Sequence, residues 1–320
     1  ERSVNILRAE MPGHNVDKLT PRASGTAKIL YYIYLALTVL ETVLLLCGGM
    51  PLFDSIVHAL GTAGTGGFGI KADSIASYSH FCQWVITVFM LLFGVSFNMY
   101  YLLLIKRWRE VLKSNELKCY LGISLAAMII IVLSIMPLYG SIADAVRLSA
   151  FQVSSIVTTT GYATADFDAW PSLAKAVLLI LMFFGGCMGS TAGGLKMSRV
   201  TVLAQIARND LRHALRPREV STVILNGRRV DAQGERQILS YFALYIAVIG
   251  AVFLLISFEP FGIETNFSAT VSCVNNIGPG FGQVGPSLSY ADYSAFSKLV
   301  LSFAMLLGRL EIYPLLLLLS

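Results

Sequence analysis

The sequence predicts an all-α membrane protein made of repeated units, each with a long helix, a short helix, a glycine-rich loop and a second long helix. Hydrophobic residues make up 55% of the 320 residues and charged residues only 13%, against about 25% charged residues in soluble domains. Long apolar runs reach the roughly 20 residues that a membrane-spanning helix needs. A glycine-rich signature recurs three times between such runs. This composition excludes a disordered chain, a coiled coil and most soluble enzymes.

The internal repeat has a regular spacing. In each unit a long apolar run is followed by a shorter one, by the signature and by a second long run. From the start of the first run to the expected central glycine of the signature, the three units measure 37, 42 and 40 residues. Self-similarity of this kind indicates one structural unit used three times. The units are predicted at residues 29–105, 119–200 and 238–320.

The shorter apolar runs are predicted to be re-entrant helices. They cover residues 52–60, 142–157 and 267–274. At 1.5 Å per residue, most of them are too short to cross a hydrocarbon core of about 30 Å. Each should therefore enter the membrane and return to the same side through its glycine-rich loop, while the two long helices of the unit span the membrane.

Basic residues mark the cytoplasmic face. Of the 24 Lys and Arg residues, 18 fall in residues 1–28, 106–118 and 199–236. The positive-inside rule assigns these stretches to the cytoplasm. We therefore expect cytoplasmic linkers at 1–28, 106–118 and 201–237. A nucleic-acid interface is disfavoured, because the basic residues are dispersed among the spans rather than gathered on one soluble domain.

Acidic residues follow the signatures on the opposite face, at Asp73, Asp166, Asp168 and Asp292. Near the outer mouth of an ion pathway they would raise the local concentration of cations. Ordinary solvated loop charge explains them equally well, and the sequence leaves both interpretations open.

The glycine-rich loops suit a cation. Irregular backbone at membrane depth is tolerated only inside protein or along a watery cavity, and glycine adopts conformations closed to other residues. Successive carbonyl oxygens can then replace the water shell of a cation, as in potassium filters. Each short helix precedes its loop, so that the partial negative charge of the helix C-terminus faces the loop. Helix packing could explain one glycine cluster, but three clusters at matched positions favour an ion pathway.

Other kinds of site are poorly supported. The stretch GSTAGGLK at 189–196 approaches a phosphate-binding loop, but Leu195 interrupts the pattern and the flanks are membrane helix. The five cysteines and four histidines show no metal-ligand spacing. No nucleophile–base pair stands out, so that we expect neither an enzyme nor an organic cofactor.

Five motifs resemble the Trk/Ktr/HKT superfamily of potassium transporters, and most closely its bacterial TrkH-like subunits. They are TGGFG (65–69), TTGYA (159–163), NIGPG (276–280), GGCMGSTAGGLK (185–196) and LLGRLEIYPLL (306–316). The resemblance implies a K+-channel-like architecture, in which four helix–pore-helix–helix repeats surround one pseudo-fourfold pore. The three units here match repeats two, three and four. The resemblance also implies a multi-pass protein of the bacterial inner membrane, a homodimer, and a cytosolic nucleotide-binding regulatory ring of the TrkA type.

The resemblance further implies a selectivity filter in the three signatures. Its expected residues are Thr65, Gly66, Gly67 and Phe68, then Thr159, Thr160, Gly161 and Tyr162, and finally Asn276, Ile277, Gly278 and Pro279. K+ should be bound by the backbone carbonyls of Thr65, Gly66, Thr160, Gly161, Ile277 and Gly278, with Gly66, Gly161 and Gly278 as the central glycines. Pro279 stands where a potassium channel has an aromatic residue. We therefore expect only a modest preference for K+ over Na+, with Rb+ also carried.

A glycine-rich segment in the second unit is expected to break that unit's second long helix. Residues 185–194 contain five glycines, and each glycine costs about 1 kcal/mol against alanine in a helix. The resemblance implies that this segment plugs the pore below the filter, while the sequence alone leaves a static kink equally open. The expected gate residues are Gly185, Gly186, Gly189, Ser190, Thr191, Gly193, Gly194 and Arg309.

Arg309 lies within the apolar run 299–319, where burial of its charge costs at least about 2.5–3.5 kcal/mol. Glu311 lies two positions away and therefore not on the same helix face. We expect Arg309 to face the pathway near the gate and to repel cations. A snorkelling arginine near a helix end is the alternative interpretation.

The predicted function is gated potassium uptake, controlled by the cytosolic regulatory subunit. The alternative is a proton- or sodium-coupled secondary transporter with alternating access, which also uses broken helices. Such a transporter should carry buried carboxylates in its spans, for which Glu41 and Glu311 are the candidates. The basic linker at 201–237 either contacts anionic lipid or docks the regulatory ring.

Overall fold

The first helix of every unit is long enough to span a membrane. The computed structural model describes residues 23–216, 218 and 222–310. Helices α2 (Ala23–Cys47), α7 (Asn115–Tyr139) and α11 (Ala232–Ile256) have 25 residues each. At 1.5 Å per residue each is about 37 Å long, which exceeds a hydrocarbon core of about 30 Å. The predicted fold class, an all-α membrane protein of repeated units, is confirmed.

A short helix follows each long helix, and the second and third of these short helices are mostly buried. These helices are α3 (Leu52–Ala63), α8 (Ile142–Val157) and α12 (Ile263–Val274). A carboxylate in the first turn of a helix is stabilised by the partial positive charge of the helix N-terminus. Each short helix has one such carboxylate: Asp54, Asp144 and Glu264.

The second helix of the first unit is broken, and the unbroken helix expected there is wrong. The apolar run 81–105 forms α4 (His80–Phe93) and α5 (Phe97–Leu104), which are bent by 90°. Gly94 lies at the break, where the phenol oxygen of Tyr120 would lie only 2.4 Å from a Cβ atom. Glycine and serine within a helix are a common cause of kinks, and residues 94–96 are Gly-Val-Ser.

The second helix of the second unit is interrupted as well. Helix α9 (Ser172–Leu181) gives way to a non-helical segment at residues 182–196, and the chain continues as α10 (Met197–Leu215). In the third unit, α13 (Ala295–Arg309) forms the second helix. The remainder of that apolar run, including Glu311, lies outside the described residues.

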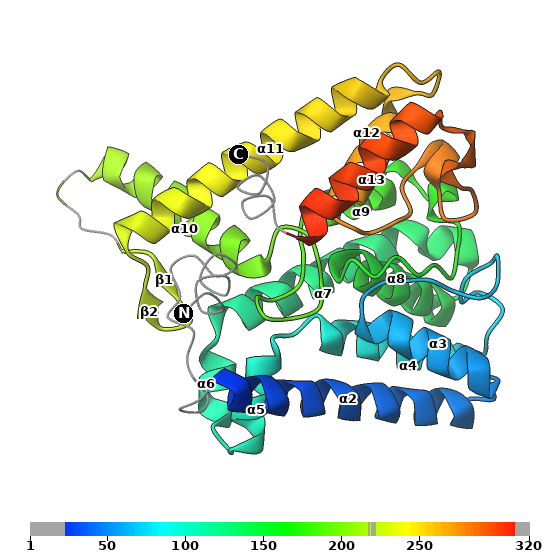
Figure 1. Cartoon of the computed structure of the whole chain (residues 1–320), viewed down its shortest axis with the longest axis horizontal. Helices are drawn as coiled ribbons and strands as arrows, with labels where there is room; N and C mark the ends of the chain where they lie inside the picture. The colour runs from blue at the N-terminus through cyan, green and yellow to red at the C-terminus, as the bar shows by residue number, and fades with distance from the viewer. Residues whose placement is uncertain (1–22, 217, 219–221, 311–320) are drawn as a thin grey trace.

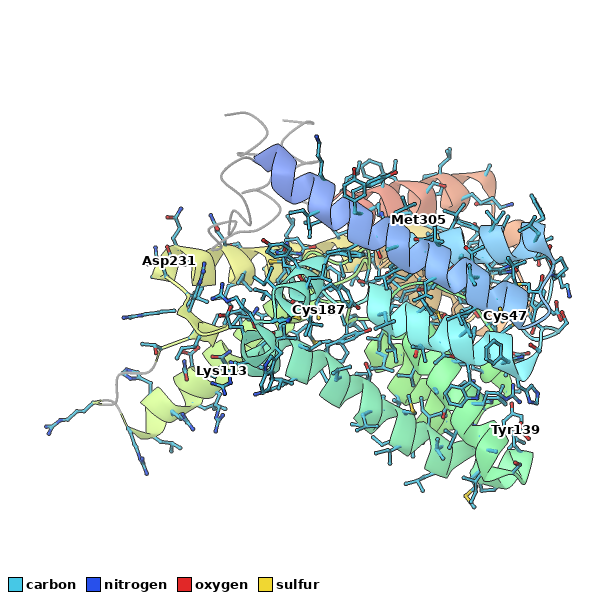
Figure 2. The ribbon with its side chains drawn as sticks, turned by 90° about the horizontal axis from the view of Figure 1, so that it is seen from below. Cys47, Lys113, Tyr139, Cys187, Asp231 and Met305 are labelled. Carbon is cyan, nitrogen blue, oxygen red and sulfur yellow. The ribbon has the colours of Figure 1, made fainter. Side chains whose placement is uncertain are left out.

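The basic stretches 106–118 and 199–236, as far as the structure describes them, gather at one end of the molecule (Figure 1). Helices α6 (Trp108–Lys113) and α10 lie at the end from which α2 and α11 begin. Figure 2 places Lys113 toward this end, Cys47 toward the other end, and Cys187 of the interrupted segment between them. By the positive-inside rule the first end is cytoplasmic.

The basic region at 201–237 contains regular structure. Most of α10 lies in it, followed by an antiparallel hairpin of β1 (Ile224–Leu225) and β2 (Arg228–Arg229), the one sheet among the described residues. The hairpin turn is Asn226-Gly227, with φ of 49° and 80°. Two left-handed residues of this kind form the tight turn that matches the twist of a two-stranded hairpin.

Replacing Gly308 by alanine should weaken the packing of α13 against α12. A Cβ atom at Gly308 would lie 1.9 Å from the carbonyl oxygen of Val274. Overpacking of this kind costs about 1–3 kcal/mol, so that thermal unfolding of the purified protein in detergent should show a lower Tm for Gly308→Ala.

The matched control is Gly250→Ala in α11. A Cβ atom there meets no described atom within 4 Å, and alanine is favoured over glycine within a helix by about 1 kcal/mol. This variant should leave the Tm unchanged or raise it. An equal fall of Tm in both variants would contradict the close contact at Gly308.

Candidate functional site

The three signatures follow the same backbone path. The residue that follows the C-cap of each short helix has a left-handed φ, and so does the glycine two positions further on. The first set is Thr65, Thr159 and Asn276, with φ of 50°, 55° and 58°, and the second is Gly67, Gly161 and Gly278, with φ of 67°, 88° and 105°. The signatures are therefore equivalent residue by residue.

This equivalence corrects the expected register of the first signature. We expected Gly66 as the counterpart of Gly161 and Gly278, but Gly67 occupies that place. Two adjacent glycines look alike in the sequence, and only Gly67 has the left-handed φ. The carbonyl pair expected from Thr65 and Gly66 accordingly moves to Gly66 and Gly67.

Each loop packs directly against the next one. A Cβ atom on Gly67 would lie 1.9 Å from the carbonyl oxygen of Thr160, and one on Gly161 would lie 1.9 Å from the carbonyl oxygen of Ile277. Only glycine permits so close an approach of two backbones. Thr160 and Ile277 occupy equivalent positions, so that the same contact recurs from the first unit to the second and from the second to the third.

The arrangement is open beside the third loop. No described atom lies within 4 Å of a Cβ atom built on Gly278. A cavity of about 770 Å³ lies there, lined by residues of the first and third units such as Phe68 and Pro279. Phe68 is 77% exposed, whereas Tyr162 at the equivalent position is fully buried. The three loops thus lie in succession, and the third of them borders this cavity.

Tyrosine hydroxyl groups contact backbone carbonyls of the loops. The Tyr162 hydroxyl lies 3.2 Å from the carbonyl oxygen of His58 and 3.3 Å from that of Phe68, so that it joins the second loop to the first unit. Tyr290 donates to the carbonyl oxygen of Gly278 at 2.7 Å. The Gly278 carbonyl, expected as an ion ligand, is therefore engaged by the outer loop of its own unit in this structure.

The interrupted segment 182–196, which we call the gate loop, is hydrogen-bonded to the base of two signatures. The Thr65 hydroxyl donates to the carbonyl oxygen of Thr191 at 2.9 Å, and the backbone N–H of Gly193 donates to the Thr159 hydroxyl at 2.7 Å. These two threonine side chains, expected in the filter, therefore contact the gate loop directly.

Arg309 lies against the same part of the gate loop. Its guanidinium donates to the carbonyl oxygen of Thr191 at 3.2 Å and to that of Gly64 at 3.5 Å. Gly64 is the C-cap of α3, where the helix carries partial negative charge. Arg309 thus brings a positive charge to the cytoplasmic side of the first signature.

The gate loop also pairs with the break between α4 and α5. The N–H of Cys187 donates to the carbonyl oxygen of Gly94 at 2.8 Å, and the N–H of Phe97 donates to that of Gly189 at 3.1 Å. Within the loop, the Ser190 hydroxyl donates to the carbonyl oxygen of Cys187 at 2.6 Å. Each broken segment therefore satisfies backbone groups that the other leaves unpaired.

Glycine is required at several positions of the gate loop, because its backbone folds back closely on itself. A Cβ atom on Gly185 would lie 2.2 Å from the carbonyl oxygen of Gly193, and one on Gly186 would lie 2.8 Å from that of Gly94. Gly189 and Gly194 have the left-handed φ values of 75° and 70°.

Glu116 was not among the residues predicted from the sequence. This residue lies near the start of α7 and is only 2% exposed. It accepts a hydrogen bond of 2.6 Å from the backbone N–H of Met188 in the gate loop. An acidic residue in the first turn of a helix is common on dipole grounds alone, so the sequence carried no signal for this contact.

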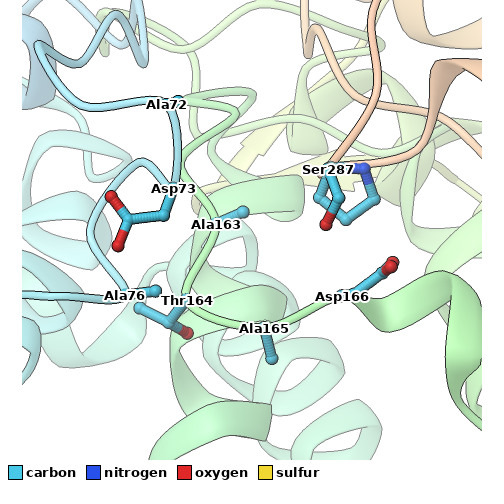
Figure 3. A pocket seen from close by; sticks show the side chains of 9 residues that line it. Ala72, Asp73, Ala76, Ala163, Thr164, Ala165, Asp166 and Ser287 are labelled. Atoms are coloured by element: carbon cyan, nitrogen blue, oxygen red, sulfur yellow. The ribbon is translucent and has the colours of Figure 1, made fainter.

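The outer mouth brings together side chains from all three units (Figure 3). Asp73, Asp166 and Ser287 line a cavity of about 310 Å³. The carboxylate of Asp168 is 3.4 Å from the ammonium group of Lys175, which offsets its charge. Burial, together with a hydrogen bond to Asp54, raises the pKa of Tyr78 in the loop that carries Asp73.

Short helices, glycine loops in mutual contact and a broken helix beneath them define a helical membrane protein built from repeated units. A family model described as TrkH, cation transport protein, matches residues 1–320, and the chain belongs to this family. Family members are transport proteins and not enzymes. The chain is accordingly a multi-pass protein of the bacterial inner membrane, as predicted.

Relatives of known identity agree with this assignment. The Trk system potassium uptake protein TrkG of Escherichia coli K12 is 33% identical over 325 residues, which cover 98% of this chain and 65% of the relative. TrkH of Salmonella typhimurium is 33% identical, with 98% and 66% covered. The crystal structure of the potassium transporter TrkH from Vibrio parahaemolyticus matches with a TM-score of 0.88 at 31% identity, covering 99% of this chain and 69% of that one. The chain thus spans just under two thirds of the length of these two curated relatives.

The corrected register can be tested by alanine at two adjacent glycines. Gly67→Ala should lower the free energy of unfolding by about 2 kcal/mol or more, because a left-handed φ and an overpacked contact each cost about 1–2 kcal/mol. Gly66→Ala should cost less than about 1 kcal/mol, since the nearest atom to its Cβ would be in the side-chain ring of Phe68, at 3.3 Å. Thermal unfolding in detergent measures both. A larger loss of stability for Gly66→Ala than for Gly67→Ala would show that Gly66 is the counterpart of Gly161 and Gly278.

Proposed function

We propose that the chain forms three sides of a gated potassium-uptake pathway. The observation that carries the proposal is the repeated contact in which the filter glycine of one unit meets a backbone carbonyl of the next. A ring of backbone carbonyls can replace the water shell of a cation. The relatives' names, potassium uptake proteins, support K+ as that cation. A membrane potential of 100 mV favours inward movement of a monovalent cation by about 2.3 kcal/mol.

The ion ligands in this proposal are backbone carbonyls of Gly66, Gly67, Thr160, Gly161 and Ile277. The carbonyl of Gly278 becomes a further ion ligand when it releases the Tyr290 hydroxyl and turns toward the pathway. A closed pathway requires a fourth wall, and the cavity beside Gly278 is the place for it. The unequal side chains behind the ring, which are Phe68, Tyr162 and Pro279, favour a filter that prefers K+ over Na+ modestly and also carries Rb+.

The gate loop is the closed gate of this pathway. Its position directly beneath two signatures, and its hydrogen bonds to Thr65 and Thr159, support this assignment over a static kink. Arg309 reinforces the block, because its charge repels a cation that leaves the filter and its two hydrogen bonds tie the gate loop to the end of α3. At the outer mouth, Asp73 and Asp166 attract cations to the filter.

The cytoplasmic end is the proposed docking surface for a regulatory ring of the TrkA type. Exposed arginines of α10, the hairpin and the start of α11 support this: Arg208, Arg212, Arg216, Arg228, Arg229 and Arg236. Arg199, also in the basic stretch, is buried and lies 3.9 Å from the ring centre of Tyr241, so that it belongs to the protein interior. The homodimer rests on the family resemblance alone.

Arg309→Ala should raise cation flux severalfold. The substitution removes a positive charge and two hydrogen bonds from the gate, while the filter glycines stay in place. The measurement is uptake of radioactive Rb+ into proteoliposomes that hold equal amounts of the full-length protein. Lys298→Ala on the same helix is the control, because Lys298 bonds the outer-loop carbonyl of Ala291 instead of the gate. Unchanged or lower flux for Arg309→Ala would remove Arg309 from the gate.

Glu41 favours the secondary transporter as a second candidate function. It lies in α2 and is fully buried, and neither carboxyl oxygen has a hydrogen-bond partner among the described residues. Its neighbour Thr62 belongs to the last turn of α3, just before the first signature. A buried carboxyl group at this depth can carry a proton, which coupled transport requires. Glu311, the other candidate, lies outside the described residues.

Glu41→Gln separates the two functions. Glutamine is close in size to the protonated acid and does not titrate. A uniport pathway predicts that Rb+ flux follows the K+ gradient and membrane potential alone, and that Glu41→Gln keeps this flux. A proton-coupled transporter predicts K+ accumulation driven by a pH gradient and its loss in Glu41→Gln. The flux is measured in proteoliposomes with the K+ and pH gradients set independently.

A further inference from the structure

We propose that Glu116 and Asn226 form a positioning link that couples the cytoplasmic hairpin to the gate loop. The inference rests on the proposed gate and adds an input to it. Three parts of the chain that are far apart in sequence meet at this point: the start of α7, the hairpin turn and the gate loop.

Glu116 holds the gate loop from the cytoplasmic side. Its Oε1 atom accepts the 2.6 Å hydrogen bond from the N–H of Met188, and the backbone of Ser198, at the start of α10, bonds the same carboxylate. Hydrogen bonds to a buried charged group are among the stronger ones in proteins. Glu116 therefore contacts both the gate loop itself and the start of the helix that follows it.

Asn226 holds Glu116 in place from the hairpin. Its Oδ1 atom accepts hydrogen bonds from the Ser114 hydroxyl at 2.9 Å and from the N–H of Glu116 at 3.4 Å. Its Nδ2 atom is 3.5 Å from Oε2 of Glu116. One amide group thus covers the N-terminus of α7 and also contacts the carboxylate that bonds the gate loop.

The hairpin and α10 are packed against each other. The side-chain amide of Gln205 makes two hydrogen bonds of 3.0 Å with the backbone of Ile224, one through each of its polar atoms. Beneath them lies a small separate hydrophobic core, formed by Val202, Val223, Leu225, Val230 and Ile238. Because α10 begins directly after the gate loop, the packed hairpin and α10 are connected to the gate twice, once covalently and once through Asn226 and Glu116.

The hairpin has an exposed basic surface that a partner can bind, and it is connected to the gate loop through Asn226. Arg228 and Arg229 are exposed on β2, where an acidic protein surface in the cytosol can bind them. Displacement of the hairpin would withdraw Asn226 from α7 and weaken the hold of Glu116 on Met188. The gate loop would then lose this hold and keep its hydrogen bonds with Thr65, Thr159, Arg309 and the α4–α5 break.

The experiment uses the full-length protein in proteoliposomes and measures Rb+ uptake, single-channel open probability and unitary conductance. Glu116→Ala removes the acceptor of Met188 and should shift the gate equilibrium toward open by about tenfold or more, since hydrogen bonds to charged groups contribute on that scale. Glu116→Gln keeps an oxygen that accepts the hydrogen bond from Met188, so that its gate equilibrium should stay close to that of the unsubstituted protein. Glu110→Ala, an exposed acid on α6, is the control that should change nothing.

Asn226→Gly tests the hairpin itself. Glycine keeps the left-handed turn and removes only the amide group, so that open probability should rise about threefold with unitary conductance unchanged. In the Glu116→Ala background the same change should have no further effect, because the two residues act through one path. Equal effects in both backgrounds, or no effect of either substitution while Arg309→Ala still raises flux, would overturn the link. Absence of any Rb+ flux in the unsubstituted protein would instead overturn the proposed function.

Discussion

The constraint on which this structure depends is that backbone polar groups at membrane depth must find partners inside the protein. Two helices are broken here, at residues 94–96 and at 182–196, and each break on its own would leave N–H and carbonyl groups unpaired. The structure solves both problems together, because Cys187 bonds Gly94 and Phe97 bonds Gly189. The break in the first unit therefore supplies the backbone partners for the gate loop of the second.

The same constraint explains why the gate loop can be both irregular and well placed. Its other contacts go to groups fixed by separate elements: Thr65, Thr159, Arg309 and Glu116. These contacts are hydrogen bonds, whereas Met182, Cys187 and Leu195 of the same loop lie in the main hydrophobic core. Polar contacts and apolar packing together therefore fix the irregular backbone of this loop, since packed interiors resist gradual deformation.

Much of the fold could be predicted from the sequence, because apolar run length and the spacing of the signatures follow from membrane thickness and helix rise. The register of the first signature was missed, although the five-residue motifs TGGFG, TTGYA and NIGPG already align Gly67 with Gly161 and Gly278. The kink at Gly94 had a weaker signal, a glycine and a serine inside an apolar run. The contact of Glu116 with Met188 joins residues 72 positions apart, and nothing local in either segment points to the other.

The differences among the three units matter as much as their repetition. A symmetric ring would place the same side chain at Thr65, Thr159 and Asn276, but only the two threonines bond the gate loop, and the side-chain nitrogen of Asn276 has no hydrogen-bond partner among the described residues. The second unit supplies the gate loop itself, the first receives it, and the third supplies Arg309. In the proposed function one loop closes the pathway and meets different partners on each side, which a fourfold-symmetric protein could not provide. The departures from symmetry are therefore what the proposed gate requires.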